Sequence, residues 1–169
     1  GMRANTLVIW TSDNGTTAGV IEPPFVTSHA KSTQYEQGVG VPLVVAGPKV
    51  GEPGRSTQAL GHFVDIYRTV ISMCDGDFDL VDNLTPFDGV DLSPVLASSA
   101  GVAPRTTMYT ESFTPNGRQL NASTTGRRAI MNASGYKLIT WAAGVSFPQL
   151  GGAQTGAEFY NLNTDPNET

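Results

Sequence analysis

The stretch Asn5-Thr-Leu-Val-Ile-Trp-Thr-Ser-Asp-Asn-Gly15 decides the fold class of this chain. Its four consecutive apolar residues, Leu7 to Trp10, show no polar alternation, which is typical of a strand covered on both faces in a parallel sheet. The strand is expected to end at the turn cluster that begins at Ser12. The stretch therefore predicts an α/β fold with a buried strand that opens into a turn.

A second run of the same kind, Val41-Pro-Leu-Val-Val-Ala46, predicts another buried strand of a parallel or mixed sheet. Residues 15–40, between the two runs, are rich in Gly, Ser, Thr and Pro, so we expect a long functional loop there. From Leu60 to Cys74 apolar residues recur at helical spacing, which predicts a helix that covers a sheet face. Cys74 is expected to be buried on that helix, and His62 to pack or cap at its start.

Beyond a boundary that we place near residue 103, the sequence pattern changes to one that predicts short antiparallel strands. Ser134-Gly135 is a turn signal tight enough for a hairpin between two of these strands. We therefore predict that residues 1–103 form the α/β part and that residues 104–169 form a small four-stranded antiparallel sheet. The expected strands are Thr106–Phe113, Arg128–Asn132, Tyr136–Trp141 and Glu158–Leu162.

Length, charge and composition exclude several classes of protein. The chain has 169 residues, about one ordinary domain, and a net charge of −5, which offers no cationic field for a nucleic acid. No stretch approaches the ~20 apolar residues that span a bilayer, and no export signal is visible, so localisation stays open. The single cysteine forms no internal disulfide.

The turn Ser12-Asp-Asn-Gly15 is the strongest candidate for chemistry, because ligands of α/β sheets bind outside the carboxyl ends of strands. Adjacent oxygen donors on Asp13 and Asn14 suit Ca²⁺ or Mg²⁺, although the same residues also form ordinary Asx turns. Lys31 is a lone cation in the following loop and could hold an anionic oxygen beside such a metal. The alternative is a solvated surface lysine.

In this order and spacing, the sequence blocks resemble the second half of a type I sulfatase of the alkaline-phosphatase-like superfamily. The resemblance covers nearly the whole chain. Its blocks are Thr6–Gly15, Lys31–Pro48, Gly61–Val70, Asp88–Leu96, Arg128–Ile139 and Glu158–Glu168.

The resemblance implies that Asp13 and Asn14 are calcium ligands and that Lys31 contacts the sulfate group. His29 is a further candidate for substrate contact, and Glu36 is expected to anchor the loop. The implied reaction is calcium- and formylglycine-dependent hydrolysis of an organic sulfate ester. No Cys/Ser-x-Pro/Ala-x-Arg motif for formylglycine occurs in these residues, so no catalytic nucleophile is assigned here. We expect a carboxy-terminal sulfatase fragment that is inactive alone and holds calcium weakly or not at all.

Two alternatives remain open. A phosphodiesterase or phosphonate hydrolase of the same superfamily would typically carry Asp-His at the Asp13-Asn14 position, so Asn14 favours a sulfatase. A non-catalytic oligomerising or interaction module is the other alternative. Two strands patterned for burial on both faces lead us to expect a homo-oligomer, or a missing amino-terminal half as partner.

Overall fold

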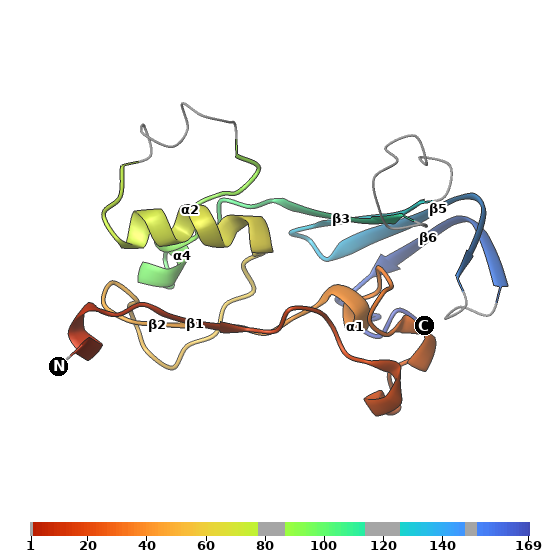
Figure 1. Ribbon diagram of the computed structural model, residues 1–169, viewed down its shortest axis with the longest axis horizontal. Coiled ribbons are helices and arrows are strands. Elements are labelled where there is room, and N and C mark those ends of the chain that lie inside the picture. Colours follow the sequence, from red (N-terminus) through yellow and green to blue (C-terminus); the bar gives the residue numbers. More distant parts are fainter. Residues whose placement is uncertain (1, 78–86, 114–125, 148–151) are drawn as a thin grey trace. The chain divides into compact units, whose positions relative to one another are not determined.

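The structure is a computed structural model that describes residues 2–77, 87–113, 126–147 and 152–169 (Figure 1). Its contacts divide the chain into two compact units. The first consists of Gly1–Thr11 and Leu43–Met108, and the second of Ser12–Pro42 and Tyr109–Thr169. The chain thus passes between units near Met108, close to the predicted boundary at residue 103, and also at both ends of segment 12–42. The assignment of 1–103 and 104–169 as domains stays a prediction.

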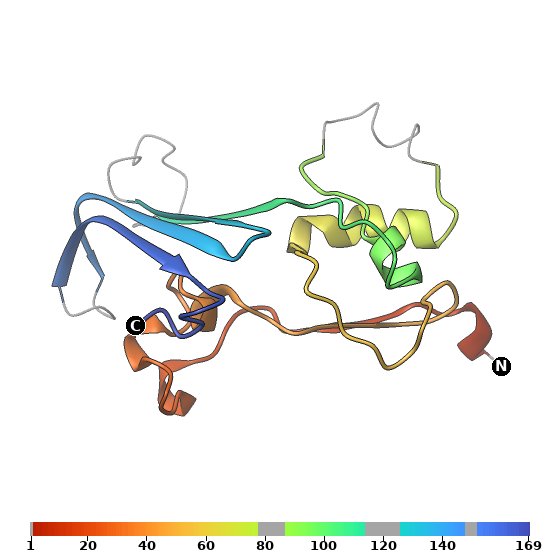
Figure 2. The same ribbon diagram turned by 180° about the vertical axis from the view of Figure 1, so that it is seen from behind.

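The first unit is built on a two-stranded sheet. Strands β1 (Val8–Thr11) and β2 (Leu43–Ala46) pair antiparallel, with Trp10 opposite Val44. Helices α2 (Phe63–Met73) and α4 (Ser93–Ala97) lie over one face of this pair in both opposite views (Figures 1 and 2). A short 3-10 turn, Met2–Asn5, precedes β1.

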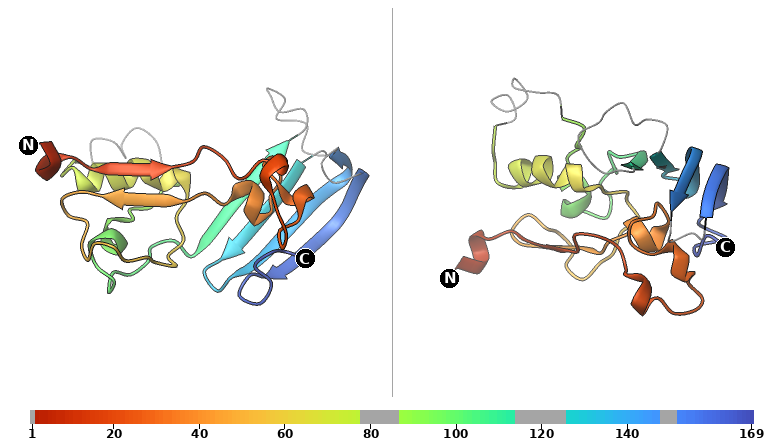
Figure 3. Two further views of the ribbon diagram at one scale, coloured as in Figure 1. Left: turned by 90° about the horizontal axis from the view of Figure 1, so that it is seen from below. Right: turned by 45° about the vertical axis from the view of Figure 1, so that its right-hand side comes forward.

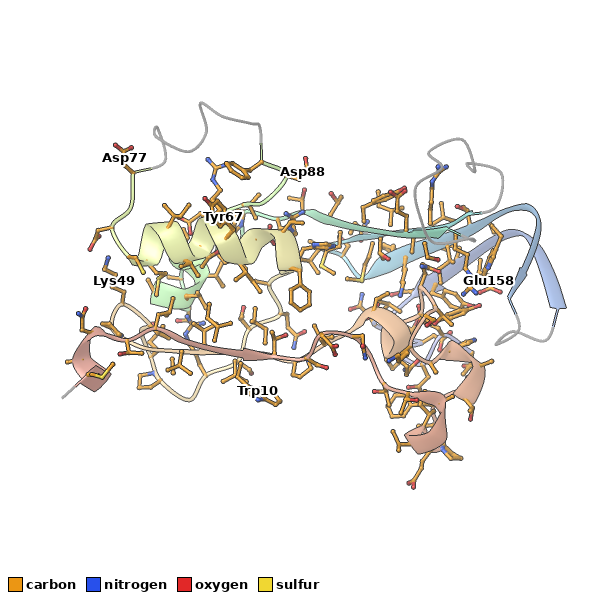
Figure 4. The ribbon with its side chains drawn as sticks, in the orientation of Figure 1. Trp10, Lys49, Tyr67, Asp77, Asp88 and Glu158 are labelled. Carbon is orange, nitrogen blue, oxygen red and sulfur yellow. The ribbon has the colours of Figure 1, made fainter. Side chains whose placement is uncertain are left out.

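The other face of the β1–β2 pair is bare, which corrects two expectations. Val8 is 55% exposed, Trp10 59% and Val44 54%. Figure 4 shows Trp10 projecting away from α2. The predictions of parallel pairing and of burial on both faces are therefore wrong for these two strands. An unbroken apolar run shows that both faces of a strand are apolar, but it specifies neither the partner strand nor the layer that covers each face.

Helix α2 forms where the apolar spacing predicted it, and His62 caps it as expected. The His62 ring accepts a hydrogen bond from the backbone N–H of Val64 at 3.3 Å, and Asp65 Oδ2 accepts from the His62 N–H at 2.7 Å. This reciprocal capping box satisfies N–H groups that the first turn leaves without helical partners. Among the described residues, no helix is long and apolar enough to cross a membrane.

Cys74 is exposed, so the prediction of a buried thiol is wrong. It stands just after the last helical residue, and the next residue, Asp75, has a φ of 57°. The left-handed turn ends the helix there, so the apolar stripe stops covering the core one residue before Cys74.

A buried carboxylate joins the separate segments of the first unit. Asp65 is fully buried and accepts hydrogen bonds from the backbone of His62, from the Val90 N–H at 2.9 Å and from Arg105 Nε at 2.7 Å. A second bond, from Arg105 Nη2 to Asp65 Oδ1, makes the ion pair bidentate. Thr69, one turn further along α2, accepts from the Leu92 N–H at 3.0 Å. These bonds attach the chain around α4 to the buried side of α2.

The second unit contains the predicted four-stranded sheet, in the order β3-β4-β5-β6 (Figure 3, left). The β4–β5 and β5–β6 pairs are antiparallel, which confirms the expected sheet. Three strands are longer than predicted: β4 begins before Arg128, β5 continues past Trp141, and β6 begins before Glu158. The four strands are Thr107–Phe113, Gly126–Asn132, Tyr136–Phe147 and Gly152–Asn161.

The hairpin between β4 and β5 forms at Ser134-Gly135, as predicted. Gly135 has a φ of 81°, a left-handed conformation that a residue without Cβ adopts at little cost. Asn132 Oδ1 accepts from the backbone N–H groups of Ser134 and Tyr136, both at 3.0 Å. These local bonds set the register of the hairpin, in which Ala129 lies opposite Ile139.

The core of the second unit lies on one face of this sheet. Because strand side chains alternate, Ala129, Ile139 and Trp141 share a face and are all buried. Tyr35, from segment 12–42, packs against them with 3% exposure. Residues 15–40 of that segment, predicted as a long loop, contain the short helical turns Ala18–Val20, Thr27–His29 and α1 (Glu36–Val39).

Candidate functional site

The predicted metal ligands stand directly after β1. Strand β1 ends at Thr11, and Asp13 and Asn14 follow in an exposed turn. The Ser12 hydroxyl donates to the Asn14 carbonyl at 2.8 Å, and Asn14 Nδ2 donates to the Gly15 carbonyl at 2.9 Å. The local turn therefore uses the amide nitrogen of Asn14 and leaves its side-chain oxygen directed elsewhere.

The Lys31 side chain lies next to the side-chain oxygen of Asn14. Its Nζ lies 3.5 Å from Asn14 Oδ1, although the two residues are 17 positions apart and both are exposed. The structure thus brings together the two features that sequence reasoning singled out separately. The Lys31 ammonium and the Asn14 amide oxygen form a small exposed polar pair after β1, and the exposed Asp13 directly precedes Asn14 in the chain.

The donor set of this site fits calcium in kind. The carboxylate of Asp13 and the amide oxygen of Asn14 are the hard oxygen ligands that Ca²⁺ takes. Within the residues that the structure describes, no group of three or more His, Cys, Asp or Glu side chains is placed to hold a metal. Two side chains could supply only part of the 6–8 oxygens that Ca²⁺ takes.

Backbone hydrogen bonds hold this site in place. The Thr16 N–H donates to the Gln37 carbonyl at 2.7 Å, and the Lys31 N–H donates to the Thr16 carbonyl at 2.8 Å. A Cβ on Gly15 would lie 2.2 Å from the Gln37 carbonyl oxygen, so only glycine permits this close approach. The turn with Asn14 and the backbone of Lys31 therefore both rest on α1.

His29, the second candidate for substrate contact, lies in the interior. It is 9% exposed, and its ring stacks on Tyr35 with centroids 3.5 Å apart and planes 6° from parallel. Burial lowers the pKa of His29, which favours the neutral ring. The structure thus buries His29 against Tyr35, and its contact with substrate stays a prediction.

Tyr35 continues the interior network through Glu158 on β6, which Figure 4 labels. Glu158 Oε2 accepts hydrogen bonds from the hydroxyls of Tyr35 at 2.7 Å and Tyr160 at 2.6 Å. Burial and the nearby carboxylate raise the pKa of both tyrosines, so both hydroxyls stay protonated donors. Arg127 is fully buried on the same sheet face, and burial lowers its pKa to about 10.

A second buried network lies at the start of α1. Lys137 is 2% exposed, and its Nζ lies 2.7 Å from Glu36 Oε1 and 2.8 Å from Glu168 Oε1. Glu168, 1% exposed, also accepts from the Glu36 backbone N–H at 2.5 Å. Burial raises the pKa of Glu168, against the lowering effect of Lys137. We call Lys137, Glu36 and Glu168 the Lys137 cluster.

Sequence reasoning identified only part of these networks. It assigned Glu36 as an anchor of the loop, and the ion pair with Lys137 confirms that role. It gave no role to Lys137, Glu158 or Glu168. All three lie in the sulfatase-like blocks quoted above, so their fixed places within those blocks were the available signal.

Comparisons with known proteins agree with the resemblance. Residues 1–76 match the family model described as Sulfatase. Arylsulfatase J of Mus musculus is 33% identical over 94 residues, a match that covers 54% of this chain. The same match covers only 15% of Arylsulfatase J, so the chain spans a small part of that relative.

Solved structures show the same fold. A structure assigned as a sulfatase from Bacteroides thetaiotaomicron VPI-5482 aligns with a TM-score of 0.64 and 19% identity, over 98% of this chain and 31% of its own. The structure of Ps i-CgsB aligns with a TM-score of 0.70 and 19% identity, over 99% of this chain and 32% of its own. These alignments confirm the predicted α/β, alkaline-phosphatase-like fold class. The ordered motifs, the match of residues 1–76 to the Sulfatase family model and the shared fold all agree with the predicted resemblance to the type I sulfatases.

Proposed function

We propose that this chain forms part of a sulfatase that hydrolyses organic sulfate esters, with Asp13 and Asn14 as calcium ligands and Lys31 as the sulfate contact. One observation supports this assignment above the others. The Lys31 ammonium lies 3.5 Å from Asn14 Oδ1, so the cation and the oxygen donors share one exposed site after β1. The match of residues 1–76 to the Sulfatase family model supports the reaction class.

Each side chain has a distinct role in this proposal. The Asp13 carboxylate supplies the negative charge that a divalent cation requires, and Asn14 adds a neutral oxygen. A bound calcium ion would stabilise negative charge on a sulfate oxygen. Lys31 binds a second anionic oxygen and orients the ester. The nucleophile is assigned to no residue of this chain, because the formylglycine motif does not occur in it.

The identity of residue 14 bears on the rival reaction. Phosphoryl-transfer relatives bind two transition-metal ions, which favour imidazole ligands. Asn14 offers an amide oxygen in that place, which favours a sulfate ester over a phosphate ester. The bare apolar face of the β1–β2 pair supports the second candidate, a non-catalytic interaction module.

We expect calcium to bind this chain weakly, with a dissociation constant on the order of millimolar. Two protein ligands leave water to fill most of the coordination sphere, and the Lys31 ammonium competes for Asn14 Oδ1. Two-dimensional NMR during calcium titration measures this, with the largest shifts at Asp13 and Asn14. These shifts should disappear in Asp13→Asn.

Glu22→Gln is the matched control for this titration, because it removes an exposed carboxylate from the same unit. It should leave the shifts unchanged. Equal loss in both variants would contradict site binding, and micromolar affinity that depends on Asp13 would show that further ligands come from this chain or from a second copy.

We expect the chain alone to hydrolyse neither aryl sulfates nor aryl phosphates, because none of its residues carries the sulfatase nucleophile motif. A chromogenic sulfate and a chromogenic phosphate, each with calcium, provide the assay. Turnover that disappears in Lys31→Ala would contradict this expectation and would assign a complete active site to these residues.

A further inference from the structure

The helical turn α1 is attached to the sheet of the second unit by buried charge. At the start of α1, Glu168 Oε2 accepts the Glu36 backbone N–H, a group that no residue within this short helix can satisfy. Lys137 on β5 then pairs with both Glu36 and Glu168, at 2.7 and 2.8 Å. The penultimate residue of the chain thus meets a residue 132 positions earlier. In Figures 1 and 2 the chain end lies beside α1.

Hydrogen bonds continue from the far end of α1 to the candidate site. The carbonyl of Gln37 accepts from Thr16 N–H at 2.7 Å, and that of Gly38 accepts from Gly15 N–H at 3.3 Å. The carbonyl of Thr16 then accepts from Lys31 N–H at 2.8 Å. Each of these backbone groups has a defined hydrogen-bond partner. A shift of α1 would therefore move the turn after β1 and the backbone of Lys31 together.

We propose that Lys137 and Glu168 are positioning residues that hold α1 on the sheet and thereby keep Lys31 next to Asn14. The inference deepens the proposed function, because it takes the Asp13–Asn14–Lys31 site as the site that is positioned. Neither residue contacts that site directly.

The composition of the Lys137 cluster supports positioning over simple packing. The Lys137 ammonium and the Glu168 carboxylate are taken from water, and the Glu36 carboxylate is partly so, at a place where apolar side chains of similar volume would pack without a desolvation cost. Buried ion pairs contribute little net stability, but their donors and acceptors permit few alternative arrangements. Such a cluster therefore specifies where α1 lies.

Amide hydrogen exchange by NMR tests the inference. The N–H groups of Thr16 and Lys31 report on the path from α1, and those of Arg128 and Ala129 in the β4–β5 ladder report on the sheet. In Glu168→Gln we expect the exchange of the first pair to accelerate by about tenfold relative to the second. Lys137→Met should likewise raise the exchange rates of Thr16 and Lys31 relative to those of the two sheet amides.

Ile139→Val is the control, because it weakens the core of the same unit without touching the Lys137 cluster. It should accelerate both pairs of amides alike. A ratio unchanged in Glu168→Gln and Lys137→Met, or a ratio changed equally in Ile139→Val, would overturn the inference.

Sulfate titration separates this inference from the proposed function. If the wild-type chain shows sulfate-induced shifts at Lys31, the Glu168→Gln chain should need several-fold more sulfate for half-saturation, and unchanged affinity would overturn the inference. If the wild-type chain shows neither sulfate nor calcium shifts, the proposed function fails. In that case the amide exchange of Thr16 and Lys31, relative to that of the sheet, still tests whether Lys137 and Glu168 keep α1 and the backbone of Lys31 in place.

Discussion

Asp65→Asn is expected to lower the free energy of unfolding of the first unit by about 3–5 kcal/mol, the usual cost of removing one partner of a buried ion pair. Asp65 is fully buried and accepts from Arg105 Nε, His62 N–H and Val90 N–H. The amide would leave the Arg105 guanidinium, 13% exposed, without its carboxylate. Urea unfolding followed by far-ultraviolet circular dichroism measures the loss through the melting of α2.

Asp75→Asn is the matched control for this prediction. Asp75 pairs with Lys49 at 2.6 Å, but its side chain is 85% exposed, so the unfolding midpoint should hardly move. Equal losses in the two variants would contradict a special role for the buried pair.

The pH dependence gives an independent check on Asp65. Burial alone would raise its pKa, but the bonds from Arg105, Val90 and His62 hold the pKa below the ordinary value near 3.9. Because the folded pKa is the lower one, this stabilisation is fully present above about pH 4 and is lost as pH falls through the folded pKa. The stability difference between wild type and Asp65→Asn should therefore shrink below about pH 4. A difference that grows there would contradict the assignment.

The wild-type chain is expected to form a dimer or larger oligomer at tens of micromolar, through the bare face of the β1–β2 pair. Val8, Trp10 and Val44 are each more than half exposed on one two-stranded sheet. We expect a second copy of this chain to cover this face, because an apolar face of a short open sheet is suited to pairing with the same face of another copy.

Val44→Lys should raise the dissociation constant of this oligomer by at least about tenfold, because it buries a charge in an apolar contact. Val20→Lys is the matched control, since Val20 is 66% exposed in the other unit and should leave association unchanged. Light scattering and sedimentation velocity give the mass of each variant. A monomeric wild type at tens of micromolar, or dissociation caused equally by both variants, would contradict this interface.

Local chemistry made much of the fold predictable. Helix α2 and the small sheet follow from apolar periods of 3.6 and 2, and Ser134-Gly135 marks the hairpin because the turn requires a left-handed residue. The same reasoning placed Asp13 and Asn14 at a strand end. Each of these inferences depends on residues close together in sequence, whose geometry the backbone restricts strongly.

The pairing of β1 and β2 and the exposure of Cys74 could not be predicted in this way. An apolar run indicates what a strand can bury, but its neighbours decide direction and cover, and here one face remains open. Cys74 fits the helical stripe, yet the left-handed turn at Asp75 ends the helix just before it. In both cases the local apolar pattern was read correctly, but the surrounding chain decided the strand partner and the point where the helix ends.

By itself the sequence determined the family blocks, the helix, the strands and the residue types of the Asp13–Asn14–Lys31 site. Only the tertiary structure decided that Lys31 lies next to Asn14, and that the buried Lys137 and Glu168 lie together beside the partly exposed Glu36. The physical reason is that charged residues are ordinarily solvated, so composition predicts them on the surface. Burial becomes favourable only when opposite charges meet. Here Lys137 pairs with Glu36, 101 positions away, and Glu168 accepts the backbone N–H of Glu36, 132 positions away.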